Sequence, residues 1–182
     1  AASLAAPART LSRPNPAVGA IIVREGRVAG RGWTGEGGRP HAEAVALAQA
    51  GEQTAGATLY VTLEPCAHES ARGPSCARLI AASGLARVIV GCEDPDPRTA
   101  GKGLAHIRAA GIEAVLLPSP EAEASLAGYL MLRRHGRPEV TLKLALSLDG
   151  CLARPAGGDR WLTGKAARAH CHALRARSDA IL

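Results

Sequence analysis

The sequence contains no phenylalanine, and aromatic residues make up only 2% of its 182 residues. Hydrophobic residues still make up 47%, so the core must be built from alanine, valine, leucine and isoleucine. That content is enough to exclude wholesale disorder. The formal net charge of +6 suits anionic ligands such as phosphates, but it does not separate a nucleotide from a nucleic acid.

Long apolar runs and a disulfide framework are also lacking. No apolar stretch reaches the roughly 18 residues that a membrane-spanning helix needs. Pro7 interrupts the apolar N-terminus, which therefore lacks the pattern of a secretion signal. The five cysteines are odd in number and widely spaced, unlike those of a secreted disulfide scaffold. We therefore expect a cytoplasmic protein in a reducing compartment, without a membrane partner.

Strand and helix patterns alternate over residues 1–136 and predict an α/β layered domain. The expected strands are a hairpin within 17–33 that turns at Glu25 and Gly26, followed by 57–64, 86–92 and 112–117. The expected helices are 41–51, 74–84, 101–111 and 119–136, the last with Ser119 as its N-cap. This order predicts a largely parallel sheet behind an opening hairpin.

Residues 137–182 are expected to form a separate segment. Their patterns predict a strand over 139–150, a loop over 154–160, a helix over 163–178 capped by Thr163, and the start of a strand at 179–182. About 45 residues rarely close an independent α/β core. The segment is interpreted either as the opening of a second domain or as a piece packed on the first.

Four residues point to a zinc site. His41 and Glu43 lie where a helix is expected to begin, Cys66 follows an expected strand, and Cys76 lies in the first turn of a helix. Catalytic zinc takes three protein ligands and leaves a fourth position for water. Because helix N-termini stabilise thiolates, we expect His41, Cys66 and Cys76 to bind zinc together at the C-terminal edge of the sheet.

A histidine and glutamate in the pattern H-x-E, followed by P-C and a second cysteine, are the signature of zinc nucleobase deaminases. Zinc lowers the pKa of its bound water from 15.7 to about 7, so hydroxide is available at neutral pH. Glu43 is then expected to take the proton and pass it to the ring nitrogen and the leaving amine. Either half of the pattern alone is weak evidence for such a site. Here both halves occur in order, each at the expected end of a helix or strand.

The stretches "RPNPAVGAIIV", "PHAE", "ATLYVTLEPCAH", "GPSCARLIAASG" and "DPDPRTAGKG" resemble the deaminase half of the bifunctional riboflavin-biosynthesis deaminase/reductase family. The resemblance implies a cytidine-deaminase-like three-layer α/β/α domain with a mixed sheet. It also implies removal of the 2-amino group from 2,5-diamino-6-ribosylamino-4(3H)-pyrimidinone 5′-phosphate. His41, Cys66 and Cys76 map to the family's zinc ligands and Glu43 to its proton shuttle.

The same resemblance implies a set of residues that contact the substrate: Asn15, His68, Arg72, Asp94 and Asp96. Asn15 maps near the base, and His68 and Arg72 lie in the loop between the cysteines. Two positions depart from the family. The loop between the cysteines is one residue longer than usual, and Asp96 stands where the family has asparagine.

The tail resembles the opening of the family's reductase domain, which has a dihydrofolate-reductase-like fold and uses NADPH. The stretches are "VTLKLALSLDG" and "DRWLTGKAAR". By this resemblance Lys143, Asp149 and Thr163 lie near the cofactor or substrate. NADPH is expected only for a complete reductase domain, and residues 137–182 are expected not to reduce anything alone. A homo-oligomer is also expected.

The basic residues are expected to have two different roles. Arg72 is the first candidate for a substrate phosphate, and Lys102 is the second. Arg133, Arg134 and Arg137 are expected to be solvated at a helix end, where they complement the helix dipole.

Two other functions remain open. A polynucleotide deaminase of the same fold would stack bases on aromatic side chains, of which the sequence has only two tryptophans and two tyrosines. A structural zinc module would need a fourth protein ligand, for which His68 is the candidate. We therefore expect a phosphorylated pyrimidine as partner rather than a nucleic acid.

Overall fold

The computed structural model describes residues 1–153 and 161–182, so the loop expected at 154–160 lies outside the described residues. The chain divides into two compact units, Ala1–Pro138 and Glu139–Leu182. Within the described ranges, no helix has the length and apolarity required to cross a membrane.

The first unit opens its sheet with the expected hairpin. Strand β1 (Gly19–Arg24) pairs antiparallel with β2 (Arg27–Trp33). The two turn residues, Glu25 and Gly26, have φ values of 51° and 75°. Both values are in the left-handed region that a two-residue hairpin turn of this kind requires, so the predicted turn is confirmed.

Five strands form one mixed sheet in the order β2-β1-β3-β4-β5. Strand β3 (Thr58–Val61) pairs antiparallel with β1, while β3, β4 (Arg87–Val90) and β5 (Glu113–Leu116) run parallel. The carboxyl ends of these parallel strands therefore meet at one edge, which is where open α/β sheets hold their sites.

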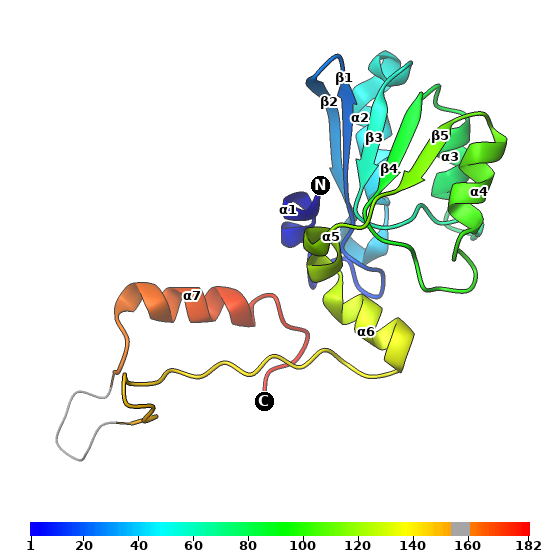
Figure 1. The fold of residues 1–182 in the computed structure, drawn as a ribbon. Helices are drawn as coiled ribbons and strands as arrows, with labels where there is room; N and C mark the ends of the chain where they lie inside the picture. The colour runs from blue at the N-terminus through cyan, green and yellow to red at the C-terminus, as the bar shows by residue number, and fades with distance from the viewer. Residues whose placement is uncertain (154–160) are drawn as a thin grey trace. The chain divides into compact units, whose positions relative to one another are not determined.

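Helices α2 (Ala42–Ala50), α3 (Cys76–Ala81) and α4 (Lys102–Ala109) lie on one face of the sheet (Figure 1). Glycine lets α2 approach the hairpin closely, since a Cβ on Gly32 would lie 2.0 Å from the Ala42 carbonyl oxygen. The core between these layers is aliphatic, as the composition predicts. Its largest side chains include Ile22, Leu59, Ile80, Val88 and Ile107.

Short helices form the other layer. They are α1 (Ala2–Ala5), η1 (Ala6–Ala8), α5 (Pro120–Ser125) and α6 (Ala127–His135). Gly19 faces α1, because a Cβ there would lie 2.1 Å from the Ala1 carbonyl oxygen. The layered α/β/α arrangement follows the expectation, although the helix at residues 2–5 was not predicted. Two 3₁₀ turns complete the unit, η2 (Glu36–Gly38) and η3 (Gly51–Thr54).

The single helix expected over 119–136 is wrong, because Leu126 divides it into α5 and α6. Leu126 has φ −109° and ψ 5°, and its side chain is 2% exposed. Burying this leucine in the core while the chain changes direction accounts for the break. The Ser119 cap is confirmed, since its hydroxyl accepts a hydrogen bond from the Ala122 N–H at 3.2 Å.

The second unit contains α7 (Lys165–Arg175), whose N-cap is Gly164 rather than the expected Thr163. The strands expected over 139–150 and 179–182 are wrong, since the structure has none there. Alternating apolar residues from Val140 to Leu148 are largely exposed instead. A strand needs a hydrogen-bonded neighbour, and the described part of this unit offers none.

Candidate active site

Three metal-ligating side chains converge at the C-terminal edge of the sheet. His41 is the N-cap of α2, Cys66 follows β3, and Cys76 begins α3. One ligand atom from each residue lies within 4.8 Å of the others, and in the described part of the chain this is the one such group of three. We call these residues the metal group. These residues are distant in the sequence, but they meet because each lies at or near the end of a helix or strand.

Direct contacts hold the metal group together. The Nδ1 atom of His41 lies 3.2 Å from Cys76 Sγ and 3.6 Å from Cys66 Sγ. The backbone N–H of Cys76 donates to Cys66 Sγ at 3.2 Å. Hydrogen bonds from Cys76, mainly from its side chain, lower the pKa of the Cys66 thiol to about 4. A lowered pKa favours the thiolate, which is the form that binds metals.

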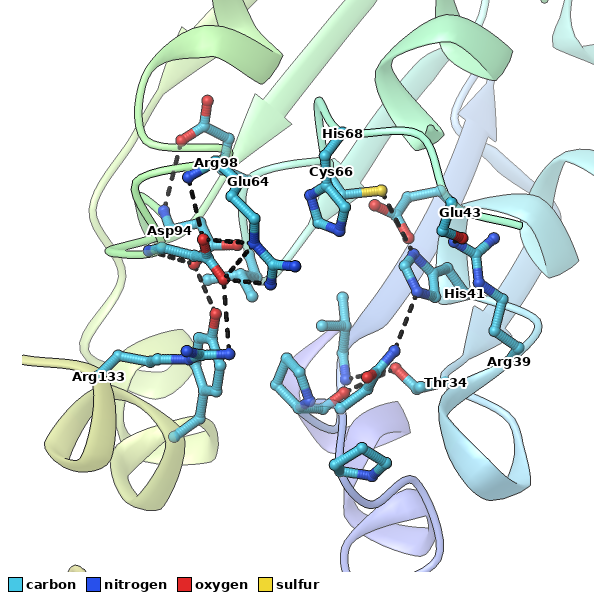
Figure 2. Close-up of a pocket in the computed structure, with 18 of the residues that line it drawn as sticks. Thr34, Arg39, His41, Glu43, Glu64, Cys66, His68, Asp94, Arg98 and Arg133 are labelled. Atoms are coloured by element: carbon cyan, nitrogen blue, oxygen red, sulfur yellow. Dashed lines mark hydrogen bonds and ion pairs between the residues drawn. The ribbon is translucent and has the colours of Figure 1, made fainter. Parts of the chain in front are cut away.

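Glu43 lies beside this group with its carboxyl group buried. It is in the first turn of α2, its residue is 3% exposed, and it lines the pocket (Figure 2). Burial raises the pKa of the Glu43 carboxyl, while the nearby His41 opposes that shift. A raised carboxyl pKa suits a residue that must both take and give a proton near neutral pH.

Asn15 contacts the His41 ring at Nε2, the ring nitrogen that does not face the cysteines. Its side-chain nitrogen lies 3.2 Å from His41 Nε2 and donates to the Gly38 carbonyl at 3.0 Å. A Cβ on Gly38 would lie 2.6 Å from the Asn15 side chain, so the contact requires glycine at this position. The N-terminal segment therefore helps to orient the imidazole, as partners of metal-binding histidines commonly do.

A cavity of about 210 Å³ opens onto His41, Glu43 and Cys66. Figure 2 shows these residues on one side of it, facing Asp94, Arg98 and Arg133 on the other. Every residue that the family resemblance assigned to the substrate lines this cavity: Asn15, His68, Arg72, Asp94 and Asp96. The structure thus brings together the metal group and these candidates, although their roles stay predictions.

The loop between the cysteines supplies His68 and Arg72. The Nδ1 atom of His68 lies 3.4 Å from the Thr99 hydroxyl, and His68 is not part of the metal group. Arg72 is exposed and donates to the Gly37 carbonyl at 2.9 Å. Arg39, which sequence reasoning missed, also lines the cavity and donates to Ser70 Oγ at 3.2 Å. These contacts tie the longer loop to the segment that precedes α2.

Glu64 is a second residue that sequence reasoning missed. It is 2% exposed, and its two carboxylate oxygens accept hydrogen bonds from the backbone N–H groups of Asp94 at 3.4 Å, Gly101 at 3.1 Å and Leu104 at 3.1 Å. A buried carboxylate is stable when N–H donors surround it in this way. Glu64 therefore anchors the loop of residues 94–101 to the end of β3.

The side opposite the metal group carries a network of charged residues. Arg98 binds Asp96 through two nitrogens, with Nη2 2.6 Å from Oδ2 and Nε 2.9 Å from Oδ1. This pairing holds the pKa of the Asp96 carboxyl well below its usual range. Tyr129 and Arg133 of α6 complete what we call the far side: Asp94, Asp96, Arg98, Tyr129 and Arg133.

Arg133 has a contact that was not expected. It lies in the last turn of α6 and is exposed, as expected, but it also lines the cavity, with its Nη2 atom 3.5 Å from Asp96 Oδ2. The available signal was the spacing of Tyr129 and Arg133, which lie four positions apart on one helix face. Lys102, the second phosphate candidate, does not line this cavity and donates to the Pro97 carbonyl at 2.7 Å.

The three residues assigned to the reductase lie in the second unit. Lys143 and Asp149 are exposed, and Asp149 accepts a hydrogen bond from the Ser147 hydroxyl. The carbonyl of Thr163 accepts a hydrogen bond from Arg168. Their roles toward NADPH stay predictions.

The metal group fits zinc by the chemistry of its donors. One imidazole and two cysteine sulfurs are a known ligand set for catalytic zinc. Two sulfurs packed against a buried carboxylate cannot all be charged without a cation nearby, and the pKa of Cys76 is accordingly raised through its contact with Cys66. A divalent cation among the three ligand atoms would remove that conflict.

Taken with the mixed sheet, this site defines the class of zinc-dependent nucleobase deaminases. The chain belongs to the family described as the cytidine and deoxycytidylate deaminase zinc-binding region, whose model matches residues 1–92. Residues 138–182 match the model of the RibD C-terminal domain. The resemblance of both parts to the riboflavin-biosynthesis deaminase/reductase is thereby confirmed.

Individual relatives agree with both matches. The riboflavin biosynthesis protein RibD of Haemophilus influenzae is 47% identical over all of this chain and 49% of its own length. A solved structure of Acinetobacter baumannii RibD has a TM-score of 0.81 at 44% identity, over 98% of this chain and 50% of that one. The Thermotoga maritima diaminohydroxyphosphoribosylaminopyrimidine deaminase/5-amino-6-(5-phosphoribosylamino)uracil reductase has a TM-score of 0.83 at 39% identity, over 96% of this chain and 50% of that one. The chain spans about half the length of the relatives it matches.

Proposed function

We propose that this chain catalyses the zinc-dependent hydrolytic deamination of 2,5-diamino-6-ribosylamino-4(3H)-pyrimidinone 5′-phosphate, the deaminase step of riboflavin biosynthesis. The observation that carries the proposal is the convergence of His41, Cys66 and Cys76 beside the buried carboxyl group of Glu43. The reaction class follows from the family. The substrate follows from the deaminase activity printed for the Thermotoga maritima relative.

His41, Cys66 and Cys76 would hold the zinc ion. When bound, zinc acts as a Lewis acid that makes water a nucleophile at neutral pH. Glu43 takes a proton from the attacking water and delivers it to the ring nitrogen next to the reacting carbon. It then takes the remaining proton from the oxygen that has added to the carbon and gives it to the amine, so that the C–N bond breaks, ammonia leaves and the oxygen becomes the carbonyl of the uracil. The raised pKa of Glu43 lets one group perform both transfers.

The remaining pocket residues would bind the substrate. Asn15 lies against the ring of His41, where it can reach the base. Asp94 and Asp96 offer acceptors to amino or hydroxyl groups, while His68 and Arg72 can donate to the phosphate from the inter-cysteine loop. The extra loop residue leaves Arg72 on the cavity lining, which favours the assignment.

Three further expectations are retained. Residues 137–182 belong to a reductase domain, and Lys143, Asp149 and Thr163 contribute to its NADPH or substrate site once that domain is complete. The protein forms a homo-oligomer. It works in the cytoplasm, where reducing conditions suit its five free cysteines.

The test is a comparison of substrates. Zinc-loaded protein should release ammonia from the phosphorylated diaminopyrimidine in equimolar amount with the uracil product. Cytidine, deoxycytidylate and a tRNA anticodon stem should yield ammonia at least about a hundredfold more slowly, because a site built to bind polar substrate groups discriminates strongly against ligands that lack them. Faster release from any of those three would replace the proposed substrate.

A further inference from the structure

Helix α6 contributes two neighbouring side chains to the far side of the pocket. The Tyr129 hydroxyl donates to Asp94 Oδ1 at 2.7 Å, and Arg133 Nη2 lies 3.5 Å from Asp96 Oδ2. The guanidinium of Arg133 also lies 5.6 Å from the centroid of the Tyr129 ring, within the range of a cation–π contact. One helix face thus contacts both aspartates of the loop.

The two oxygens of Asp94 differ in their partners. Oδ1 accepts the Tyr129 hydroxyl and the backbone N–H of Asp96, the latter at 3.0 Å. Over residues 1–153 and 161–182, no hydrogen bond involves Oδ2. Asp94 is 6% exposed and lines the pocket. Among the described residues no fully buried side-chain oxygen lacks a partner, so Oδ2 remains accessible from the pocket. A ligand that brings an N–H or O–H group could therefore donate a hydrogen bond to Oδ2.

We propose that Tyr129 and Arg133 are positioning residues of the pocket. Tyr129 fixes Asp94 through Oδ1 so that Oδ2 accepts a hydrogen bond from an amino or hydroxyl group of the substrate. Arg133, with Arg98, holds Asp96 beside it. This inference rests on the proposed function, whose substrate carries amino groups on the ring and hydroxyl groups on the ribose.

The charges around Asp94 fit this role. Asp96, two residues away, pairs with Arg98 of the loop and Arg133 of α6, and the carboxylate of Glu64 accepts the backbone N–H of Asp94. Burial, together with the hydrogen bond to Asp94, raises the pKa of Tyr129, so the phenol keeps the proton it donates. Arg98 contacts Asp96 through two nitrogens, whereas Arg133 approaches it through one. Arg133 is therefore the weaker of the two contacts that hold Asp96 in place.

Tyr129→Phe is the sharpest variant, because it removes the hydroxyl and keeps the ring under Arg133. We expect kcat/KM to fall about tenfold, mostly through KM, as for loss of a hydrogen bond to a charged group. The same change in an Asp94→Asn background should alter kcat/KM less than twofold, because the group through which Tyr129 acts is already changed. A full tenfold loss in that background would show that Tyr129 acts through the fold alone and would overturn the proposal.

Arg133→Gln has a matched control in Arg134→Gln. Both arginines are on α6 with side chains 44% exposed, but Arg134 pairs with Glu123 at 3.9 Å and does not line the pocket. Arg133→Gln should raise KM at least threefold, as expected when one of two arginines on a carboxylate is lost. Arg134→Gln should leave KM within a factor of two. Equal effects would contradict a role for Arg133 in the pocket.

Calorimetric binding of the same phosphorylated compound separates this inference from the proposed function. If the wild-type chain binds the compound but does not release ammonia, the proposed function fails, and a Kd about tenfold weaker for Tyr129→Phe still supports the inference. If the wild type turns over and Tyr129→Phe matches it in both KM and Kd, the inference alone fails. A wild type that neither binds nor turns over contradicts both.

Discussion

On one side of the pocket His41 and Cys76 begin helices and Cys66 follows a strand, so the backbone itself sets their positions. On the far side Tyr129 reaches Asp94 from 35 positions along the chain, and side-chain contacts set the geometry. The first arrangement tolerates little change, because each ligand is tied to an element of the core. The second can be altered one contact at a time. The comparison suggests that the metal group sets the chemistry and that the far side sets which substrate is bound.

The two sides also differ in charge. Around the metal group two cysteine sulfurs and a buried carboxyl group lie beside one imidazole, a set of groups that a divalent cation would stabilise. On the far side two arginines accompany Asp96, so the acid is neutralised within the protein. Substitutions in the metal group should therefore remove most of the deaminase activity, whereas substitutions on the far side should reduce it by a smaller factor.

The largest expected effect is that of Cys76→Ser, which tests the metal side directly. A hydroxyl is a poor ligand for zinc compared with a thiolate, so zinc content should fall from about one per chain to well below half, and deaminase activity should fall with it. Cys92→Ala is the matched control, because Cys92 is also buried but lies outside the metal group. Full zinc retention by Cys76→Ser, measured by metal analysis, would remove Cys76 from the ligand set.

Glu43→Gln should distinguish the loss of proton transfer from the loss of zinc binding. Glutamine keeps the volume of the side chain but cannot accept the proton, so turnover should fall by about 10²–10⁴-fold, the usual contribution of a general acid–base residue. Zinc content should stay at the wild-type level, since Glu43 is not in the metal group. A variant with near-normal kcat would take Glu43 out of the mechanism.

Arg72→Ala tests whether the inter-cysteine loop binds the phosphate. The loss should weaken kcat/KM on the phosphorylated substrate by about 1.5–3 kcal/mol, the range for a hydrogen bond to a charged group, and toward the low end because Arg72 is exposed. The dephosphorylated substrate should be scarcely affected. His68→Ala provides the comparison within the same loop. Equal losses on both substrates would mean that Arg72 supports the loop instead.

The smallest effect concerns stability at low pH. The folded-state pKa of Asp96 is depressed below its unfolded value of about 3.9, so its contribution to stability is present above that pH and is lost as the pH falls below it. Because the Arg98 side chain is 59% exposed, we expect about 1 kcal/mol or less. Asp96→Asn should therefore lose less stability than the wild type between pH 5 and pH 2.5, approximately the range over which this carboxyl takes up its proton in the unfolded state. Parallel urea-unfolding curves for the two proteins would contradict the pairing.

The metal group could be predicted from the sequence because its signals are local. The helix starts at His41 and Cys76 and the end of the strand before Cys66 can each be read within a few residues. Parallel strands bring their carboxyl ends to one edge, and the structure places all three residues there. The parallel strands behind an opening hairpin followed from the alternation of strand and helix patterns.

The far side could not be predicted in the same way. The break at Leu126 depends on which leucine the core buries, and it is this break that separates α6 from α5. Arg133 is exposed at the end of its helix as expected, but its contact with Asp96 could not be predicted because the two residues are distant in sequence. The strand expected over 139–150 failed for a related reason, since alternation predicts a strand only where another strand can pair with it.

The central claim is that the metal group makes this chain a deaminase, and a zinc titration tests it most directly. Protein freed of metal by a chelator would be titrated with zinc while ammonia release from the phosphorylated diaminopyrimidine is followed. The account predicts no release without zinc, a linear rise to about one zinc per chain, and a plateau beyond that, as for a single three-ligand site. Full activity in the metal-free protein, or no activity at one zinc per chain, would contradict it.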